Sequence, residues 1–85
     1  MSYRRKVIVT GASSGIGRAT AMRFATDGCD ICVNARREER LRELVKSFPS
    51  GDHLVCPGSY DCEALVADMN QQVRNSWGRV DVLVN

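Results

Sequence analysis

The chain has 85 residues, which is enough for one domain with a small hydrophobic core. Its 44% hydrophobic and 26% charged residues are typical of a globular domain, and a net charge of +2 is too small to indicate a nucleic-acid partner. No apolar run approaches the roughly 18 residues of a membrane span, and the polar N-terminus lacks the apolar core of a signal peptide. We therefore expect a cytoplasmic protein with no membrane or nucleic-acid partner.

The first predicted strand, residues 6–10, is apolar on both faces, which is typical of a central parallel strand covered by helices. It runs directly into a glycine-rich turn over residues 11–17, which opens into a helix predicted over residues 14–27. A strand, a glycine turn and a helix in this order bring backbone N–H groups up to a phosphate. The segment therefore predicts a phosphate-binding turn.

Each small residue of this turn has an expected role. Gly11 lets the chain turn sharply off the strand, because only glycine takes positive φ freely. Gly15 lacks a Cβ, so that a pyrophosphate can approach the backbone, and Gly17 allows the helix to pack closely on the strand. Ser13 and Ser14 add hydroxyl donors, and either is suited to cap the helix.

Beyond this turn, strand and helix patterns continue to alternate. The predicted strands cover residues 29–34, 53–56 and 80–84, and the predicted helices cover residues 38–48 and 61–77, the second capped by Asp61. This alternation predicts an α/β fold with a parallel sheet and right-handed crossovers. We expect a Rossmann-like, doubly wound sheet (β-α-β-α-β-α-β), truncated after its fourth strand, with the first strand beside the fourth.

Four cysteines and one histidine raise the question of a metal site or a disulfide. Cys29 and Cys32 have the C-x-x-C spacing, but they flank a predicted buried strand and would point to opposite faces of the sheet. A metal or redox pair needs both sulfurs on one side. We therefore predict reduced, packed cysteines, a surface role for His53 and no metal site.

The end of the second strand reads Asn34-Ala35-Arg36-Arg37. In dinucleotide-binding folds, an acid at this point binds the ribose 2′-hydroxyl, whereas an arginine accommodates a 2′-phosphate. Ala35 occupies the position of the acid and Arg36 follows it, which favours NADP(H) over NAD(H). The alternative is that Arg36 and Arg37 are merely solvated, although cations at a helix start are unfavourable unless an anion is near.

The string Thr10-Gly11-Ala12-Ser13-Ser14-Gly15-Ile16-Gly17 resembles the cofactor-binding signature of the short-chain dehydrogenase/reductase family. The resemblance extends over the whole chain. Residues 77–85 are similar to the family's fourth strand, which leads into an Asn-Asn-Ala-Gly motif of which only Asn85 is present. The resemblance implies a set of cofactor-binding residues, namely Gly11, Ser13, Ser14, Gly15, Ile16, Gly17, Arg36, Arg37, Ser59 and Asn85.

The chain departs from the family after the third strand. The family usually places an aspartate there, near the adenine, whereas this chain reads Gly58-Ser59-Tyr60-Asp61. Depending on a one-residue register, Gly58 or Ser59 takes the place of the acid. Contact of Ser59 or Tyr60 with the adenine is then an alternative that the sequence does not decide. Asp61 is assigned to the helix cap.

Catalysis in the family rests on a serine and a Tyr-x-x-x-Lys pair, and the latter does not occur in this chain. No catalytic residue is therefore nominated. Residues 1–85 are expected to form a single partial dinucleotide-binding domain, the NADP(H)-binding portion of an oxidoreductase that transfers hydride between nicotinamide and a carbonyl or alcohol.

The predicted fourth strand, residues 80–84, would present an open apolar edge, which is a template for association. We expect self-association or pairing with a missing C-terminal half at this edge. The alternative function is a non-catalytic nucleotide-binding or interaction module that uses the open edge to bind a partner.

Overall fold

The computed structural model describes residues 4–85, which form a four-stranded sheet and three helices. The elements in chain order are β1 (Lys6–Thr10), α1 (Gly15–Thr26), β2 (Asp30–Ala35), α2 (Glu38–Lys46), β3 (Leu54–Pro57), α3 (Glu63–Ser76) and β4 (Val82–Val84). The strands pair in parallel in the order β3-β2-β1-β4. The predicted α/β fold, and the position of the first strand beside the fourth, are confirmed.

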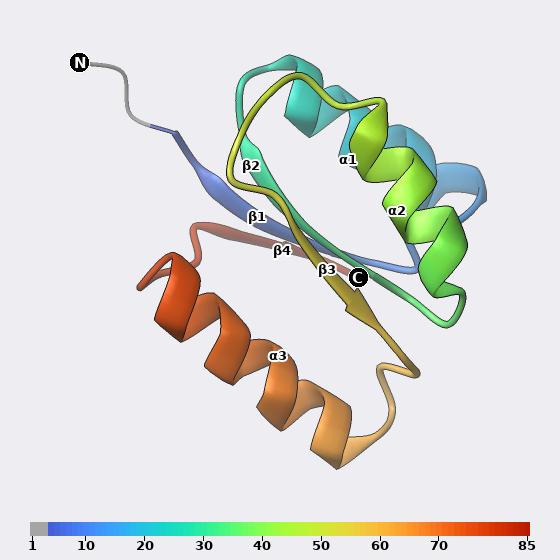
Figure 1. The fold of residues 1–85 in the computed structure, drawn as a ribbon, viewed down its shortest axis with the longest axis vertical. Helices are drawn as coiled ribbons and strands as arrows, with labels where there is room; N and C mark the ends of the chain where they lie inside the picture. Colours follow the sequence, from blue (N-terminus) through green and yellow to red (C-terminus); the bar gives the residue numbers. More distant parts are fainter. Residues whose placement is uncertain (1–3) are drawn as a thin grey trace.

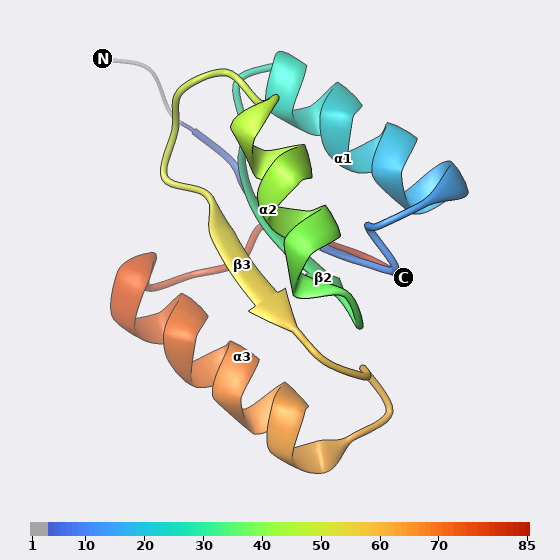
Figure 2. The same cartoon turned by 45° about the vertical axis from the view of Figure 1, so that its right-hand side comes forward.

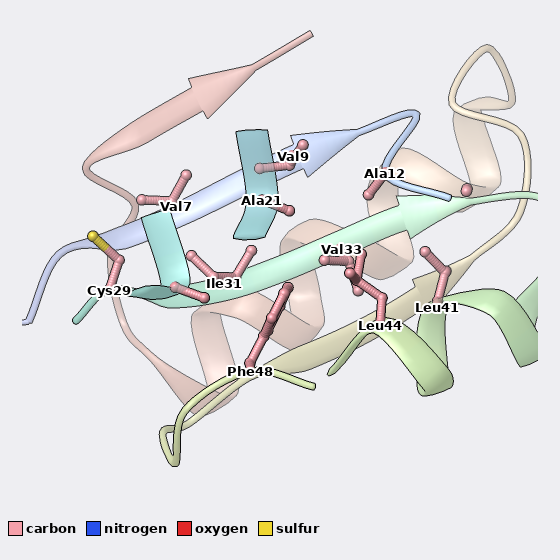
Figure 3. Close-up of a cluster of buried hydrophobic side chains, with 12 residues drawn as sticks. Val7, Val9, Ala12, Ala21, Cys29, Ile31, Val33, Leu41, Leu44 and Phe48 are labelled. Atoms are coloured by element: carbon pink, nitrogen blue, oxygen red, sulfur yellow. The ribbon is translucent and has the colours of Figure 1, made fainter. Parts of the chain in front are cut away.

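The helices cover both faces of the sheet. α1 and α2 lie together on one face and α3 lies on the other (Figure 1, Figure 2). Because side chains alternate along a strand, Val7 and Ile31 pack under α1 and α2, whereas Ile8 and Cys32 pack against α3. Figure 3 shows the first of these clusters, in which the side chains of β1 and β2 meet Leu44 and Phe48. The sheet is therefore doubly wound.

One face of α3 is buried against the sheet. Met69 and Val73, one turn apart, form this face together with Trp77, and all three are buried. Cys29 belongs to the cluster under α1 and α2 and Cys32 to the cluster under α3, so their predicted opposite orientation is confirmed. All four cysteines are free, but Cys62 is exposed, so the predicted packing holds for Cys29, Cys32 and Cys56 and is wrong for Cys62. Within residues 4–85 no three His, Cys, Asp or Glu side chains gather as metal ligands would.

The predicted helix cap at Asp61 is wrong. α3 begins at Glu63 with Cys62 in the N-cap position, and the Asp61 carboxylate instead accepts a hydrogen bond from the Ser59 hydroxyl. The local pattern pointed to Asp61 because aspartate is a favoured N-cap residue. In the structure, the chain makes a further turn in which the Cys62 N–H donates to the Ser59 carbonyl at 3.1 Å, and this delays the helix.

Other boundaries shift by one or two residues. β4 begins at Val82 instead of residue 80, because the chain leaves α3 through Gly78, which has a φ of 80°. α2 ends at Lys46 instead of residue 48, where the Ser47 hydroxyl donates to the Leu44 carbonyl at 2.6 Å.

His53 precedes β3 and is half-buried: its Nδ1 accepts from the Ile31 N–H at 3.1 Å. It therefore supports β2 and is not a simple surface residue.

A buried carboxylate joins several segments at the amino end of the sheet. Asp30 is 1% exposed and accepts hydrogen bonds from Lys6 Nζ, from Arg4 Nε at 2.9 Å and from the Asp52 N–H at 2.9 Å. Burial acts to raise the pKa of Asp30, but these hydrogen bonds outweigh it and lower the pKa to about 2. Trp77 adds a bond from its Nε1 to the Asp52 carbonyl at 2.9 Å. The network ties β1, β2, the α2–β3 loop and α3 together.

β4 lies at the edge of the sheet and pairs only with β1 among the strands of residues 4–85. Val82 and Val84 are half-buried against the cluster under α1 and α2, whereas Leu83 is 51% exposed. Within residues 4–85 the outer side of β4 thus pairs with no strand, and Leu83 is its exposed apolar side chain. None of the helices in residues 4–85 combines the length and apolar character that crossing a membrane requires.

Candidate functional site

The turn between β1 and α1 has the backbone geometry that its glycines predict. Gly11 and Gly15 have φ values of 63° and 59°, in the left-handed region that favours glycine. Ala12 is buried, and its N–H donates to the Asn34 carbonyl at 2.9 Å, which ties the turn to the end of β2. A Cβ on Gly17 would lie 2.8 Å from the carbonyl carbon of Gly11. Gly17 therefore permits the close approach of α1 to the turn.

The start of α1 is left open toward solvent. Ser14 is the N-cap residue, but its side chain makes no capping hydrogen bond, and the first turn of the helix carries no acidic residue. The first N–H groups of a helix need outside partners and carry a partial positive charge. Ile16 is 86% exposed, the most exposed of the large hydrophobic side chains in residues 4–85. This helix end is suited to an anion with an apolar neighbour.

A hollow of about 430 Å³ lies beside this turn, at the carboxyl ends of β1, β2 and β3. It is lined by residues from the ends of these strands and the segments that follow them, namely Thr10, Gly11, Ser13, Asn34, Ala35, Arg36, Arg37, Arg40, Gly58, Ser59 and Tyr60. In open α/β sheets, ligands bind in the crevice outside the carboxyl ends of the strands. The hollow is therefore the candidate binding site.

The charge of this hollow is of one sign. Three arginines line it, at positions 36, 37 and 40, and no carboxylate does. None of the three forms an ion pair within residues 4–85, whereas Arg42, also on α2, pairs with Glu38 at 2.7 Å. Unpaired guanidinium groups converging on one hollow form a suitable site for a phosphate.

On the β3 side of the hollow, the loop after the strand excludes an acid at its first position. Gly58 has a φ of 134°, and a Cβ there would lie 2.9 Å from Leu65 Cδ1. The Gly58 N–H donates to the Ala35 carbonyl at 2.8 Å, which fixes the loop against β2. Ser59 is consequently the first residue after β3 that presents a side chain to the hollow.

The structure gathers all of the predicted site residues at one end of the sheet. Five of them line the hollow: Gly11, Ser13, Arg36, Arg37 and Ser59. The adjoining start of α1 carries Ser14, Gly15, Ile16 and Gly17. Asn85 follows β4, and its Oδ1 accepts a hydrogen bond from the Thr10 hydroxyl at 3.2 Å.

Three residues that line the hollow were not among the predicted site residues: Thr10, Asn34 and Arg40. Tyr60, which the sequence left open as a contact to the base, also lines it. A signal existed for Arg40, because it lies three residues after the N-cap Arg37, a spacing that brings residues to one side of a helix. For Asn34 the only local signal was its position as the last residue of a predicted strand, which is also consistent with simple packing.

A parallel doubly wound sheet with a glycine turn after its first strand, and a ligand hollow at the strand ends, defines a dinucleotide-binding type of fold. The sequence pattern described as short chain dehydrogenase matches residues 5–85. The chain belongs to this family.

Known relatives agree with this membership. Glucose 1-dehydrogenase of Gluconobacter oxydans is 40% identical over 83 residues, which cover 94% of this chain and 31% of that protein. L-Sorbose reductase from Gluconobacter frateurii, solved with NADPH and L-sorbose, is 35% identical with a TM-score of 0.86, covering 96% of this chain and 32% of that one. YwfH, an NADPH dependent reductase, is 28% identical with a TM-score of 0.92, covering 98% of this chain and 34% of that one. The chain thus spans about a third of the length of these relatives.

Proposed function

We propose that this chain is the NADP(H)-binding portion of an oxidoreductase that transfers hydride between nicotinamide and a carbonyl or alcohol. The observation that carries the cofactor preference is the hollow lined by Arg36, Arg37 and Arg40 without a carboxylate. Hydride transfer is what a bound nicotinamide supplies. The side chains of residues 1–85 bind and orient the cofactor in this proposal, and none is assigned a catalytic role.

The pyrophosphate would lie against the start of α1. The uncapped N–H groups of this helix would bind its oxygens, and the hydroxyls of Ser13 and Ser14 would add two donors. Gly15 has no atom within 4 Å of the position of a Cβ, so the backbone is open to close approach there. The exposed Ile16 side chain would pack on the cofactor, and Asn85 would contact it at the end of β4.

The 2′-phosphate would lie between the arginines that follow β2. Ala35 occupies the position at which an NAD-binding protein carries an acid. It is buried and has no acceptor atom in its side chain, so it cannot bind a ribose hydroxyl as that acid does. Arg36 follows it directly, and Arg37 and Arg40 line the same hollow. Two of the reductases named above, L-sorbose reductase solved with NADPH and the NADPH dependent YwfH, support the same preference.

The test compares two arginines that differ in their surroundings. In Arg36→Ala the dissociation constant for NADPH should rise about tenfold or more, because a charge-assisted hydrogen bond is lost, while that for NADH stays within about twofold. Arg42→Ala is the control, since Arg42 pairs with Glu38 and does not line the hollow. Isothermal titration of the purified protein with each cofactor provides the measurement.

Two results would count against the proposal. If Arg36→Ala and Arg42→Ala weaken NADPH equally, the arginines are only solvated, and the preference for NADP(H) is wrong. If the folded wild-type protein binds neither NADPH nor NADH, the chain is not a dinucleotide-binding portion, and the interaction-module alternative becomes the working hypothesis.

A further inference from the structure

His53 lies at the amino end of the sheet, opposite the hollow, where its ring supplies a hydrogen bond that a longer strand would otherwise make. β3 begins only at Leu54, the residue that follows His53. The N–H groups of a strand alternate in direction: that of Asp30 donates to the Arg5 carbonyl beside β1, so that of Ile31 points toward β3. There the His53 Nδ1 accepts it at 3.1 Å. The ring thus extends the pairing of β2 beyond the start of β3.

The two hydrogen bonds of this ring determine where its proton lies. A backbone N–H can only donate, so Nδ1 must present its lone pair to Ile31. The single N–H of the neutral ring is then at Nε2, which lies 2.8 Å from the Pro49 carbonyl oxygen and donates to it. The ring also packs edge-on against Phe48, with the ring centroids 5.1 Å apart. His53 therefore clamps the α2–β3 loop, residues 47–53, to the start of β2.

The charged groups around the ring offset one another. A Cβ on Gly51 would lie 2.5 Å from Arg4 Nη2, 2.9 Å from His53 Nε2 and 3.0 Å from Asp30 Oδ1, so these three groups gather at one point. Four charged side chains stand beside the ring or pair with those that do, from the segment before β1, β1, β2 and the loop itself: Arg4, Lys6, Asp30 and Asp52. Two cations and two carboxylates leave no net charge, and the hydrogen bonds of the ring therefore decide its protonation.

A second proton on the ring would break this clamp. The imidazolium carries an N–H at both nitrogens and has no acceptor atom. The N–H groups of His53 Nδ1 and Ile31 would then point at each other, and the N–H of the buried Ile31 would lose its partner, which is costly. In the unfolded chain water accepts from both groups, so the proton binds there without this cost. The unfolded chain therefore binds more protons than the clamped one, and acid favours release.

We infer that His53 is an acid-sensitive latch, which holds the α2–β3 loop on β2 while the ring is neutral and loosens it when the ring gains a proton. Histidine is the side chain that takes up a proton between about pH 8 and 5, and the chain has one histidine. Asp30 stays ionised over this range, because its pKa is lowered to about 2. The backbone of Asp52 stays bound to Asp30 and to Trp77, so the change is local. The contribution of the latch is complete above about pH 7.5 and is lost as the pH falls toward 5.

The wild-type protein provides the first test without any substitution. Long-range proton–nitrogen NMR at about pH 7.5 should place the ring proton on Nε2, and a proton on Nδ1 would overturn the inference. Hydrogen exchange of the Ile31 amide measures the latch itself, with the amide of Val33 on the same strand as the internal reference. The protection of Ile31 relative to Val33 should fall about tenfold between about pH 7.5 and 5.5. Unchanged relative protection would refute the latch.

Two substitutions separate the ring proton from the charges beside it. In His53→Asn the amide oxygen stands where Nδ1 does and can accept from Ile31, but an amide takes up no proton. Between about pH 7.5 and 5.5 the equilibrium constant for urea unfolding should rise about tenfold in the wild type and less than about twofold in this variant. Asp52→Asn is the matched control: it removes an exposed carboxylate, keeps the backbone bonds of residue 52 and should retain the tenfold effect. Equal pH effects in wild type and His53→Asn, or loss of the effect in Asp52→Asn, would refute the inference.

Discussion

Replacing Gly17 by alanine tests whether the close approach of α1 to the glycine turn is essential. In an exposed helix interior this change stabilises by about 1 kcal/mol, because alanine has the higher helix propensity. At Gly17 the added Cβ would lie 2.8 Å from the Gly11 carbonyl carbon and 3.3 Å from Ala12 Cα. Carbon atoms in contact prefer about 3.5–4.0 Å, and these neighbours are backbone atoms that cannot rotate away. The start of α1 must therefore move by roughly 1 Å.

We expect this strain to reverse the sign of the usual effect. Overpacking of this kind costs about 1–3 kcal/mol, so the free energy of unfolding should fall in Gly17→Ala. A displacement of about 1 Å at the phosphate-binding helix end should also weaken NADPH binding about tenfold, because hydrogen bonds from the helix N–H groups to the pyrophosphate would lengthen. Urea unfolding followed by circular dichroism measures the first quantity, and isothermal titration measures the second.

Arg18→Ala is the control, because Arg18 is the next residue, is exposed and has no ion pair within residues 4–85. Its free energy of unfolding should stay within about 0.5 kcal/mol of the wild type. The reasoning is refuted if Gly17→Ala is as stable as the wild type and binds NADPH equally well, since the turn would then have room for a side chain.

Three further predictions concern the rest of the fold. Because the pKa of Asp30 is lowered to about 2, its ionised form should contribute about 2 kcal/mol above pH 4, and this contribution should be lost as the pH falls toward 2. Asp30→Asn should remove this contribution at pH 7, so that the free energy of unfolding falls less between pH 4 and pH 2 than it does in the wild type. An equally steep fall in both proteins would contradict the role of the ion-pair network. Trp77→Phe should lower the free energy of unfolding by about 1 kcal/mol through loss of the bond to the Asp52 carbonyl, and a neutral result in urea unfolding would show that this bond is not needed. Burial raises the pKa of Cys32 to about 12, so iodoacetamide at neutral pH should label the exposed Cys62 first. Peptide mass spectrometry measures the order of labelling. Early labelling of Cys32 would mean that the sheet opens.

Several features of the site follow from residues that are adjacent in the chain. The turn from Gly11 to Gly17 owes its shape to backbone freedom and to the absence of side chains, both of which are properties of glycine itself. The pair Arg36 and Arg37 was recognisable because it directly follows a predicted strand. Asp61 shows the limit of such local patterns, since a favoured cap residue forms its hydrogen bond with Ser59 instead.

The sequence by itself determined the alternation of strands and helices, the doubly wound parallel sheet and the glycine turn, because periodicity and glycine content act over a few neighbouring residues. Only the tertiary structure decided which distant groups meet. Asp30 binds Arg4 across 26 positions of the chain, and Asn34 reaches the carbonyl of Cys56 across 22 positions. These partners come together because parallel strands place their equivalent ends side by side, a register that no local pattern specifies. The polarity of the hollow depends on such long-range bonds, since they decide which hydrogen-bonding atoms are left for a ligand.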